Sequence, residues 1–142
     1  MVVRELMSTD VVTVHRDASL QAAVERLLEA GVGSVIVVDD DGYPVGMVTE
    51  TDALRAAAGT GAPLAAIGVV DLSHRAVVTT APDRTVQRVA RRMADEGVKK
   101  VPVLDGIDLV GILTLTDIVW HLSEIRKEAT ELGEMPDDWG PA

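Results

Sequence analysis

Gly46-Met47-Val48-Thr49-Glu50-Thr51-Asp52 decides the fold, because the chain repeats the pattern as Gly111-Ile112-Leu113-Thr114-Leu115-Thr116-Asp117. In each copy a short apolar strand follows a glycine and reaches a threonine. An aspartate stands three residues after the threonine, where a helix is expected to begin. Free N–H groups and the positive end of a helix dipole can hold a phosphate or a ribose at such a corner. Thr-x-x-Asp is also nearly a capping box, which needs no ligand, and the two roles are compatible.

The two corners belong to a tandem repeat. Gly31 aligns with Gly97 at a spacing of 66 residues, and Asp52 aligns with Asp117 at a spacing of 65 residues. The second copy therefore lacks one residue in the turn between these positions. The apolar stripe of one helix recurs with i, i+3, i+4, i+7, i+8 spacing. Its members are Leu20, Ala23, Val24, Leu27 and Leu28 in the first copy, and Val86, Val89, Ala90, Met93 and Ala94 in the second.

Each copy predicts the order β-α-β-β-α, and hence a mixed α/β (α+β) fold. One such unit leaves an apolar sheet face uncovered, so we expect the two to pack about a pseudo-twofold axis. We expect the first repeat at 1–58, a linker at 59–63, the second repeat at 64–125, and a helix end with a frayed tail at 126–142. The predicted strands are 11–14, 34–39 and 45–48, then 76–79, 100–105 and 109–113. The first predicted helix of each copy ends at Gly31 or Gly97. The second predicted helix spans 51–58 in the first copy and 116–131 in the second copy.

The composition bounds the class of protein. Of the 142 residues 47% are hydrophobic and only 2% aromatic, so the core is aliphatic. The absence of cysteine excludes disulfides, thiolate metal sites and a cysteine nucleophile. No apolar run approaches the ~18 residues of a membrane span, and the first residues lack the layout of a signal peptide. We therefore expect a cytoplasmic protein.

The chain is strongly acidic. It has 23 Asp and Glu against 13 Lys and Arg, a net charge of −10. Such a surface repels nucleic acid and anionic membranes, so neither is an expected partner. An Asp-rich, Lys-poor composition favours a host with a salty cytoplasm, although an ordinary acidic protein is the alternative. In molar salt the Debye length is only ~3 Å, so the acidity does not exclude an anionic ligand.

Other motifs do not indicate catalysis or metal binding. The glycines of 31–36 follow a helix and precede a strand, the reverse of a dinucleotide fingerprint. Residues 39–42 resemble the start of a calcium loop, but Pro44 stands where such a loop needs glycine, which favours a hairpin turn. His15, His74 and His121 lack ligand spacing, and no Ser-His-Asp triad is evident. We expect no metal, no catalytic residue and no enzyme activity.

Taken together, the sequence resembles the cystathionine-β-synthase-type family, called CBS domains, in its tandem-pair form. The resemblance rests on Glu5-Leu6-Met7 ahead of Val12-Thr13-Val14, on Gly31 and Gly97, on Val101-Pro102-Val103, and on the two Gly-x-x-Thr-x-x-Asp stretches. It implies clefts between the repeats that bind an adenosine-containing ligand: AMP, ADP, ATP or S-adenosylmethionine. It also implies pairing into homodimers and regulation of an unknown target enzyme or transporter.

The resemblance also implies roles for particular residues. Thr49 with Asp52, and Thr114 with Asp117, match the ribose-and-phosphate corner, where a carboxylate can accept from both ribose hydroxyls. The first strand and the entry of the second strand would frame the adenine and line the cleft. These positions are Val11, Val12, Thr13, Val32, Gly33 and Ser34 in the first copy, and Val77, Val78, Thr79, Val98, Lys99, Lys100, Val101 and Pro102 in the second.

The copies differ where the second has Lys99-Lys100 and the first has Gly33-Ser34. Family members similar to the regulatory subunit of AMP-activated protein kinase can carry basic residues there that meet phosphate. The second copy is therefore the better candidate for phosphate contacts, and the first suits a bare adenosine moiety or nothing. Adjacent strand residues face opposite sides, so at most one lysine serves a given cleft, and which cleft stays open. Ser73 stands where Met7 stands in the first copy, so this approach to the second repeat can pack differently.

Two hypotheses from different classes follow. The first is a stand-alone regulatory module whose ligand shifts the placement of the repeats or of two chains. The second is a structural dimerisation scaffold with vestigial clefts, in which the two corners serve only as helix caps.

Overall fold

A computed structural model describes residues 1–72 and 77–131, and the chain divides into two compact units. The first-copy unit consists of Asp10–Val77 with Ile107–Leu109, and the second-copy unit of Met1–Thr9, Val78–Gly106 and Val110–Ala142. Each combines helices with a small sheet, which confirms the predicted mixed α/β fold. Ser73, Ala76, His74 and the predicted tail beyond Gly133 lie outside the described residues.

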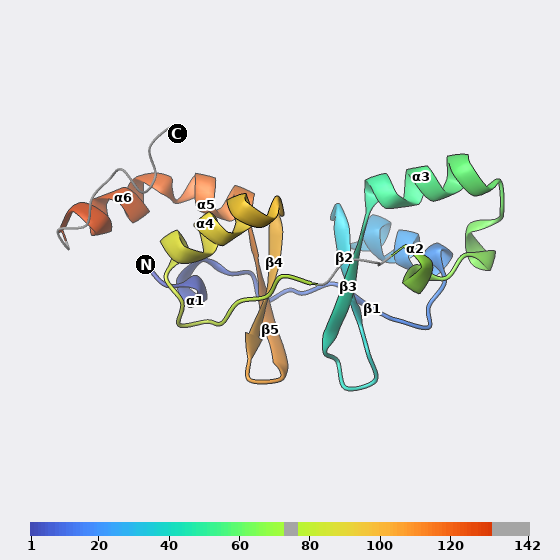
Figure 1. Ribbon diagram of the computed structural model, residues 1–142, viewed down its shortest axis with the longest axis horizontal. Coiled ribbons are helices and arrows are strands. Elements are labelled where there is room, and N and C mark those ends of the chain that lie inside the picture. Colours follow the sequence, from blue (N-terminus) through green and yellow to red (C-terminus); the bar gives the residue numbers. More distant parts are fainter. Residues whose placement is uncertain (73–76, 132–142) are drawn as a thin grey trace. The chain divides into compact units, whose positions relative to one another are not determined.

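The first-copy unit is built on a three-stranded sheet in the order β1-β2-β3 (Figure 1). β1 runs parallel to β2, and β2 runs antiparallel to β3. The helices α2 and α3 and two 3₁₀ turns complete the unit. The bounds are β1 Thr13–His15, α2 Leu20–Ala30, β2 Ser34–Val38, β3 Pro44–Thr49, α3 Glu50–Thr60, η1 Leu64–Ala66 and η2 Val69–Asp71.

The second-copy unit contains a two-stranded sheet, β4-β5, and Figure 1 shows the dark blue helix α1 beside the yellow helix α4. Its elements are α1 Val3–Leu6, α4 Val86–Glu96, β4 Lys100–Asp105, β5 Asp108–Thr114, α5 Leu115–Trp120 and α6 Leu122–Glu131. Its core is aliphatic, as the composition predicts: Val3, Leu6, Val86, Val89, Met93, Val101, Val103, Leu113, Ile118 and Ile125.

The boundaries of α2 and α4 confirm the predicted glycine ends, and a hydroxyl side chain caps the start of each helix. Ser19 Oγ accepts from the amide of Ala22, and Thr85 Oγ1 accepts from the amide of Arg88. Gly31 and Gly97 follow these helices with φ of 64° and 67°. Glycine adopts this left-handed conformation at little cost, so both helices stop at the same position of the repeat.

The segments that lead into the two repeats are exchanged between the units, which the sequence did not predict. Val3 is fully buried in the second-copy core, and its amide donates to Arg84 O at 2.9 Å. Val69, at the equivalent position of the second repeat, is fully buried in the first-copy core, and its amide donates to Ala18 O at 3.0 Å. Each core is therefore completed by the segment that begins the other repeat.

The predicted strand at 76–79 is wrong for its described residues. Residues 77–79 are irregular, and only Thr80 forms an isolated parallel bridge, to Val103. In the first copy, Ile36 N donates to Val12 O at 3.0 Å and Arg16 N donates to Val38 O at 2.8 Å. The equivalent residues of the second copy are Pro102 and Pro82, which have no N–H to donate. The two outer hydrogen bonds of the ladder are therefore missing from the second copy.

The predicted helix over 116–131 is also wrong as a single element, because α5 ends at Trp120 and α6 begins at Leu122. His121 lies between them at φ −105° and ψ 11°. The carbonyl of Asp117 is shared by the amide of His121 at 3.3 Å and its ring Nδ1 at 2.8 Å. A side chain that bonds to the preceding turn competes with the helical hydrogen-bond pattern, and the chain bends there.

Candidate functional site

Both Thr-x-x-Asp corners form complete capping boxes. At the start of α3, Thr49 N donates to Asp52 Oδ2 at 2.9 Å and Asp52 N donates to Thr49 Oγ1 at 3.2 Å. At the start of α5, both equivalent bonds, between Thr114 and Asp117, measure 3.1 Å. All four side chains are half-buried. The structure thus realises the capping role at both corners, and each box still leaves acceptor capacity on its carboxylate.

Most of the amide groups at these helix starts are already bonded. Glu50 N donates to Gly33 O at 3.0 Å, and Leu115 N donates to Lys99 O at 2.8 Å. With the capping boxes, three of the four amides from the N-cap to the third helical residue have partners in each copy. A ligand at either corner would therefore be held mainly by side chains. The Oδ1 oxygen of each aspartate is the principal acceptor, since an ionised carboxylate accepts at both oxygens.

The sheet of the first-copy unit places three predicted site residues on one face. Thr13 pairs with Ile36, and Ser34 pairs with Thr49. Because side chains alternate along a strand and paired residues share a face, Thr13, Ser34 and Thr49 lie on the same side. The alternate residues Val14, Val35, Val37 and Val48 form the core on the other side. This face is the part of the predicted site that the structure assembles.

Ser34 is the unusual residue of this face. Its side chain is only 8% exposed, and its Oγ has no hydrogen-bond partner among the described residues. Leaving a buried hydroxyl unpaired costs about 1–3 kcal/mol. Such atoms are rare in folded proteins and are commonly satisfied by a water or a ligand. A polar group next to Thr49 would satisfy this hydroxyl.

Several predicted site residues contribute to the cores instead of to this face. The side chains of Val12 and Val32 pack against the first-copy core, and those of Val78, Val98 and Val101 lie in or against the second. Val11, Val77 and Thr79 are half-buried, and Pro102 is almost fully buried on the strand position between Val101 and Val103.

The two corners differ in charge. In the first copy, Gly33 adjoins the Glu50 carboxylate, whose Oε1 lies 3.6 Å from the position that a Cβ of Gly33 would occupy. In the second copy the equivalent positions are the exposed Lys99 and the uncharged Leu115, and the half-buried Lys100 begins β4. The Glu50 carboxylate therefore lies beside the first corner, and two lysines precede the second. The predicted charge difference between the copies thus includes Glu50 as well as the lysines.

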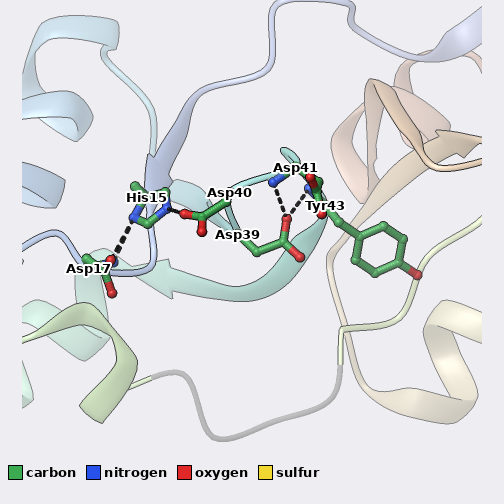
Figure 2. A network of polar contacts seen from close by, with 6 residues as sticks. All are labelled: His15, Asp17, Asp39, Asp40, Asp41 and Tyr43. Carbon is green, nitrogen blue, oxygen red and sulfur yellow. Dashed lines mark hydrogen bonds and ion pairs between the residues drawn. The ribbon is translucent and has the colours of Figure 1, made fainter.

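The turn between β2 and β3 is a hairpin held by its own aspartates, which confirms the predicted turn. Figure 2 shows Asp39 Oδ1 accepting from the amides of Asp41 and Tyr43, at 2.9 and 3.0 Å. His15 reaches this turn, with Nε2 2.5 Å from Asp40 Oδ1, and its Nδ1 accepts from Asp17 N at 3.1 Å.

Within residues 1–72 and 77–131, no group of three or more His, Asp or Glu could hold a metal ion.

One residue outside the predicted set contacts a predicted site segment. Arg92 Nη1, on α4, donates to Thr79 O at 2.9 Å. The signal that could have pointed to it is Pro102, whose missing N–H leaves this segment without a ladder bond.

None of the described helices is long and apolar enough to cross a membrane.

Comparison with known proteins identifies two matches to one family model, the CBS domain, at residues 3–59 and 69–124. An uncharacterized protein of Methanocaldococcus jannaschii is 30% identical over 139 residues, covering 89% of this chain and 33% of its own. Hypoxic response protein 1 of Mycobacterium tuberculosis is 30% identical over 123 residues, covering 85% of each chain. The chain spans 33%, 41% and 60% of the first three curated relatives that it matches.

Among solved structures, a CBS domain pair in complex with 5′-methylthioadenosine and S-adenosyl-L-methionine has a TM-score of 0.77 and 27% identity. The match covers 87% of this chain and 97% of that one.

Proposed function

The chain belongs to the CBS domain family, and we propose that it is a regulatory module that binds an adenosine-containing ligand. The ligand class is AMP, ADP, ATP or S-adenosylmethionine. The CBS domain pair solved with 5′-methylthioadenosine and S-adenosyl-L-methionine supports this class, since it shares 27% identity with nearly the whole chain.

The observation that carries the proposal is the repeated Thr–Asp corner with acceptor capacity to spare. One oxygen of each aspartate, Oδ2, accepts from the threonine amide, which fixes the carboxylate in place. The Oδ1 oxygen then accepts from the ribose hydroxyls. In the first copy, the buried hydroxyl of Ser34 gains a partner when a ligand occupies the face that it shares with Thr13 and Thr49.

The second copy supplies the phosphate contacts. Lys100 is the first residue of β4 and Lys99 directly precedes it, and the Lys99 carbonyl is bonded to the first amide of α5. An ammonium group close to this corner attracts phosphate, whereas the Glu50 carboxylate repels it from the first corner. The first copy accordingly favours an uncharged or cationic adenosine derivative.

The module acts on a partner through a second copy of the chain. α5 exposes three apolar side chains: Leu115, Val119 and Trp120 are 44%, 61% and 79% exposed. Exposed apolar clusters of this kind mark protein interfaces, so we place a homodimer contact there. Ligand binding shifts the arrangement by its differential affinity for two states, and an enzyme or transporter reads the shift. The chain itself catalyses no reaction.

The alternative is a dimerisation scaffold with vestigial clefts, which the complete capping boxes favour. Asp52→Asn and Asp117→Asn separate the two functions, because asparagine keeps an oxygen that accepts from the threonine amide but loses the charge and the second acceptor. Calorimetry with the four ligands in high salt should show micromolar or tighter binding to the native chain. Each variant should bind at least about tenfold more weakly at its own corner, with its melting temperature nearly unchanged.

Asp83→Asn is a matched control, because this exposed aspartate lies outside both corners. A folded native chain that binds none of the four ligands would exclude the nucleotide function and favour the scaffold. Equal affinity in the native chain and both Asp→Asn variants would show that a ligand binds elsewhere.

A further inference from the structure

The first-strand segments, defined as residues 11–13 and 77–79, are held in different ways in the two copies. In the first copy the segment continues into β1, whose three residues all pair with β2. In the second copy the segment is irregular, and the ladder is reduced to the bonds of Thr80. Its amide donates to Pro102 O at 3.0 Å, and its carbonyl accepts from Leu104 N at 2.8 Å.

The sequence difference responsible is the pair of prolines. Pro102 replaces Ile36, whose amide holds Val12 O at the front of the ladder, and Pro82 replaces Arg16, whose amide holds Val38 O at its end. Proline cannot make either bond. No backbone donor at position 102 can therefore fix the carbonyl of Val78, in the middle of the segment.

A side chain instead holds the neighbouring carbonyl of this segment. Arg92 Nη1 donates to Thr79 O at 2.9 Å, across 13 residues of sequence, from the outer surface of α4. A guanidinium is permanently charged and planar, so its bond to a carbonyl is stronger and more directional than one between neutral groups. Arg92 thus fixes the carbonyl of Thr79, which directly follows the Val78 carbonyl that has lost its ladder donor.

The equivalent arginine of the first copy behaves differently. Arg26 occupies the position of Arg92 in the repeat and lies 3.9 Å from Glu29, one turn further along α2. α4 offers Arg92 a similar acid, Asp95, at the same spacing, yet Arg92 bonds to the Thr79 carbonyl. The bond from Arg92 to the Thr79 carbonyl thus occurs in the copy that lacks the outer ladder bonds, because only the second copy carries Pro82 and Pro102.

We infer that Arg92 is a positioning residue of the second-copy ligand site, which fixes the backbone of residues 77–79 for contact with the adenosine moiety. The inference rests on the proposed function, since the segment frames a ligand only if the module binds one. Arg92 acts through Thr79 and need not touch the ligand. Its removal frees the segment and makes ordering it part of every binding event, which weakens affinity.

The test compares Arg92→Met, Arg92→Lys and the matched control Arg26→Met. AMP affinity is measured by calorimetry, and amide exchange is measured in a peptide covering residues 77–81 of the unliganded protein. Arg92→Met should weaken AMP binding about tenfold and accelerate exchange in this peptide. Arg92→Lys, which keeps a charged donor, should recover part of both effects. Arg26→Met should leave affinity and exchange as in the native chain.

Pro102→Ile provides a second readout, because it restores the residue type and the N–H of the first copy. Added to Arg92→Met, it should slow exchange in residues 77–81 again. Exchange that stays fast in the double variant would contradict the compensation between proline and arginine.

The possible failures are distinguishable. Native AMP affinity in Arg92→Met would overturn the positioning role and leave the proposed function intact. A native chain that binds no adenosine ligand would overturn the proposed function and the ligand role of Arg92 together. The exchange measurement would still decide whether Arg92 holds the segment.

Discussion

Val3→Ala and Val69→Ala test the exchange of lead-in segments in a matched pair. Both valines are fully buried, and they occupy the same position of the repeat. Each substitution removes two buried carbon groups worth about 0.8 kcal/mol apiece. A small cavity adds to this, so each variant should lose about 2 kcal/mol of stability. For a unit of this size, such a loss lowers the melting temperature by about 8–16 °C.

The location of the damage is the informative result. Val3 belongs to the first repeat but packs with Val86, Val89 and Val101, so Val3→Ala should raise amide exchange mainly in residues 86–114. Val69 belongs to the second repeat but packs with Leu20, Val35 and Val48, so Val69→Ala should raise amide exchange mainly in residues 20–49. Val70→Ala is the control, because Val70 is 49% exposed and its truncation should change stability by less than about 0.5 kcal/mol. Faster exchange in residues 20–49 of Val3→Ala, with 86–114 still protected, would refute the exchanged arrangement.

The structure also predicts how two glycine substitutions and the salt concentration change the stability of the protein. Gly111→Ala should cost about 1–3 kcal/mol in chemical denaturation, because its Cβ would lie 2.9 Å from Ser8 O, a backbone atom held by the paired bonds between Ser8 and Ile112. Gly59→Ala, in α3 with nothing within 4 Å, should instead stabilise the protein by up to about 1 kcal/mol, and a loss there would contradict the open surface. The melting temperature should rise between about 0.1 and 2 M KCl, since salt screens the repulsion of a net charge of −10, and a fall would count against the salt-adapted interpretation.

Local signals in the sequence predicted the elements well where the residue type dictates the backbone. Gly31 and Gly97 end their helices in the left-handed conformation, and Thr49 and Thr114 begin theirs as caps. Asp39 holds the predicted hairpin turn through its own carboxylate. In each of these cases the interaction joins residues a few positions apart, which a sequence pattern can capture.

The errors have equally specific causes. The strand predicted at 76–79 aligns with 11–14, but strand pairing needs donors on both sides, and Pro102 and Pro82 remove one donor from each. His121 divides the last helix by bonding to the turn before it. The sequence could not predict that the segments containing Val3 and Val69 each pack in the core of the other repeat. Both residues are valines at equivalent positions, so no sequence pattern indicates which core each one enters. Arg92 was missed for a related reason, since its acceptor is a backbone carbonyl 13 residues away.

The two corners share one local structure but differ in the charge of the residues beside it. Their capping boxes have nearly the same hydrogen-bond lengths, so the orientation of each carboxylate is set by the chain itself and is independent of any ligand. Under the proposed function, any difference in ligand preference between the corners would come from the side chains that flank the box, not from the box. Those flanking pairs are Gly33 with Glu50 in the first copy and Lys99 with Leu115 in the second, joined in each case by the same backbone bond. Because that bond is independent of side-chain type, the charge at these positions can vary without disturbing the helix start.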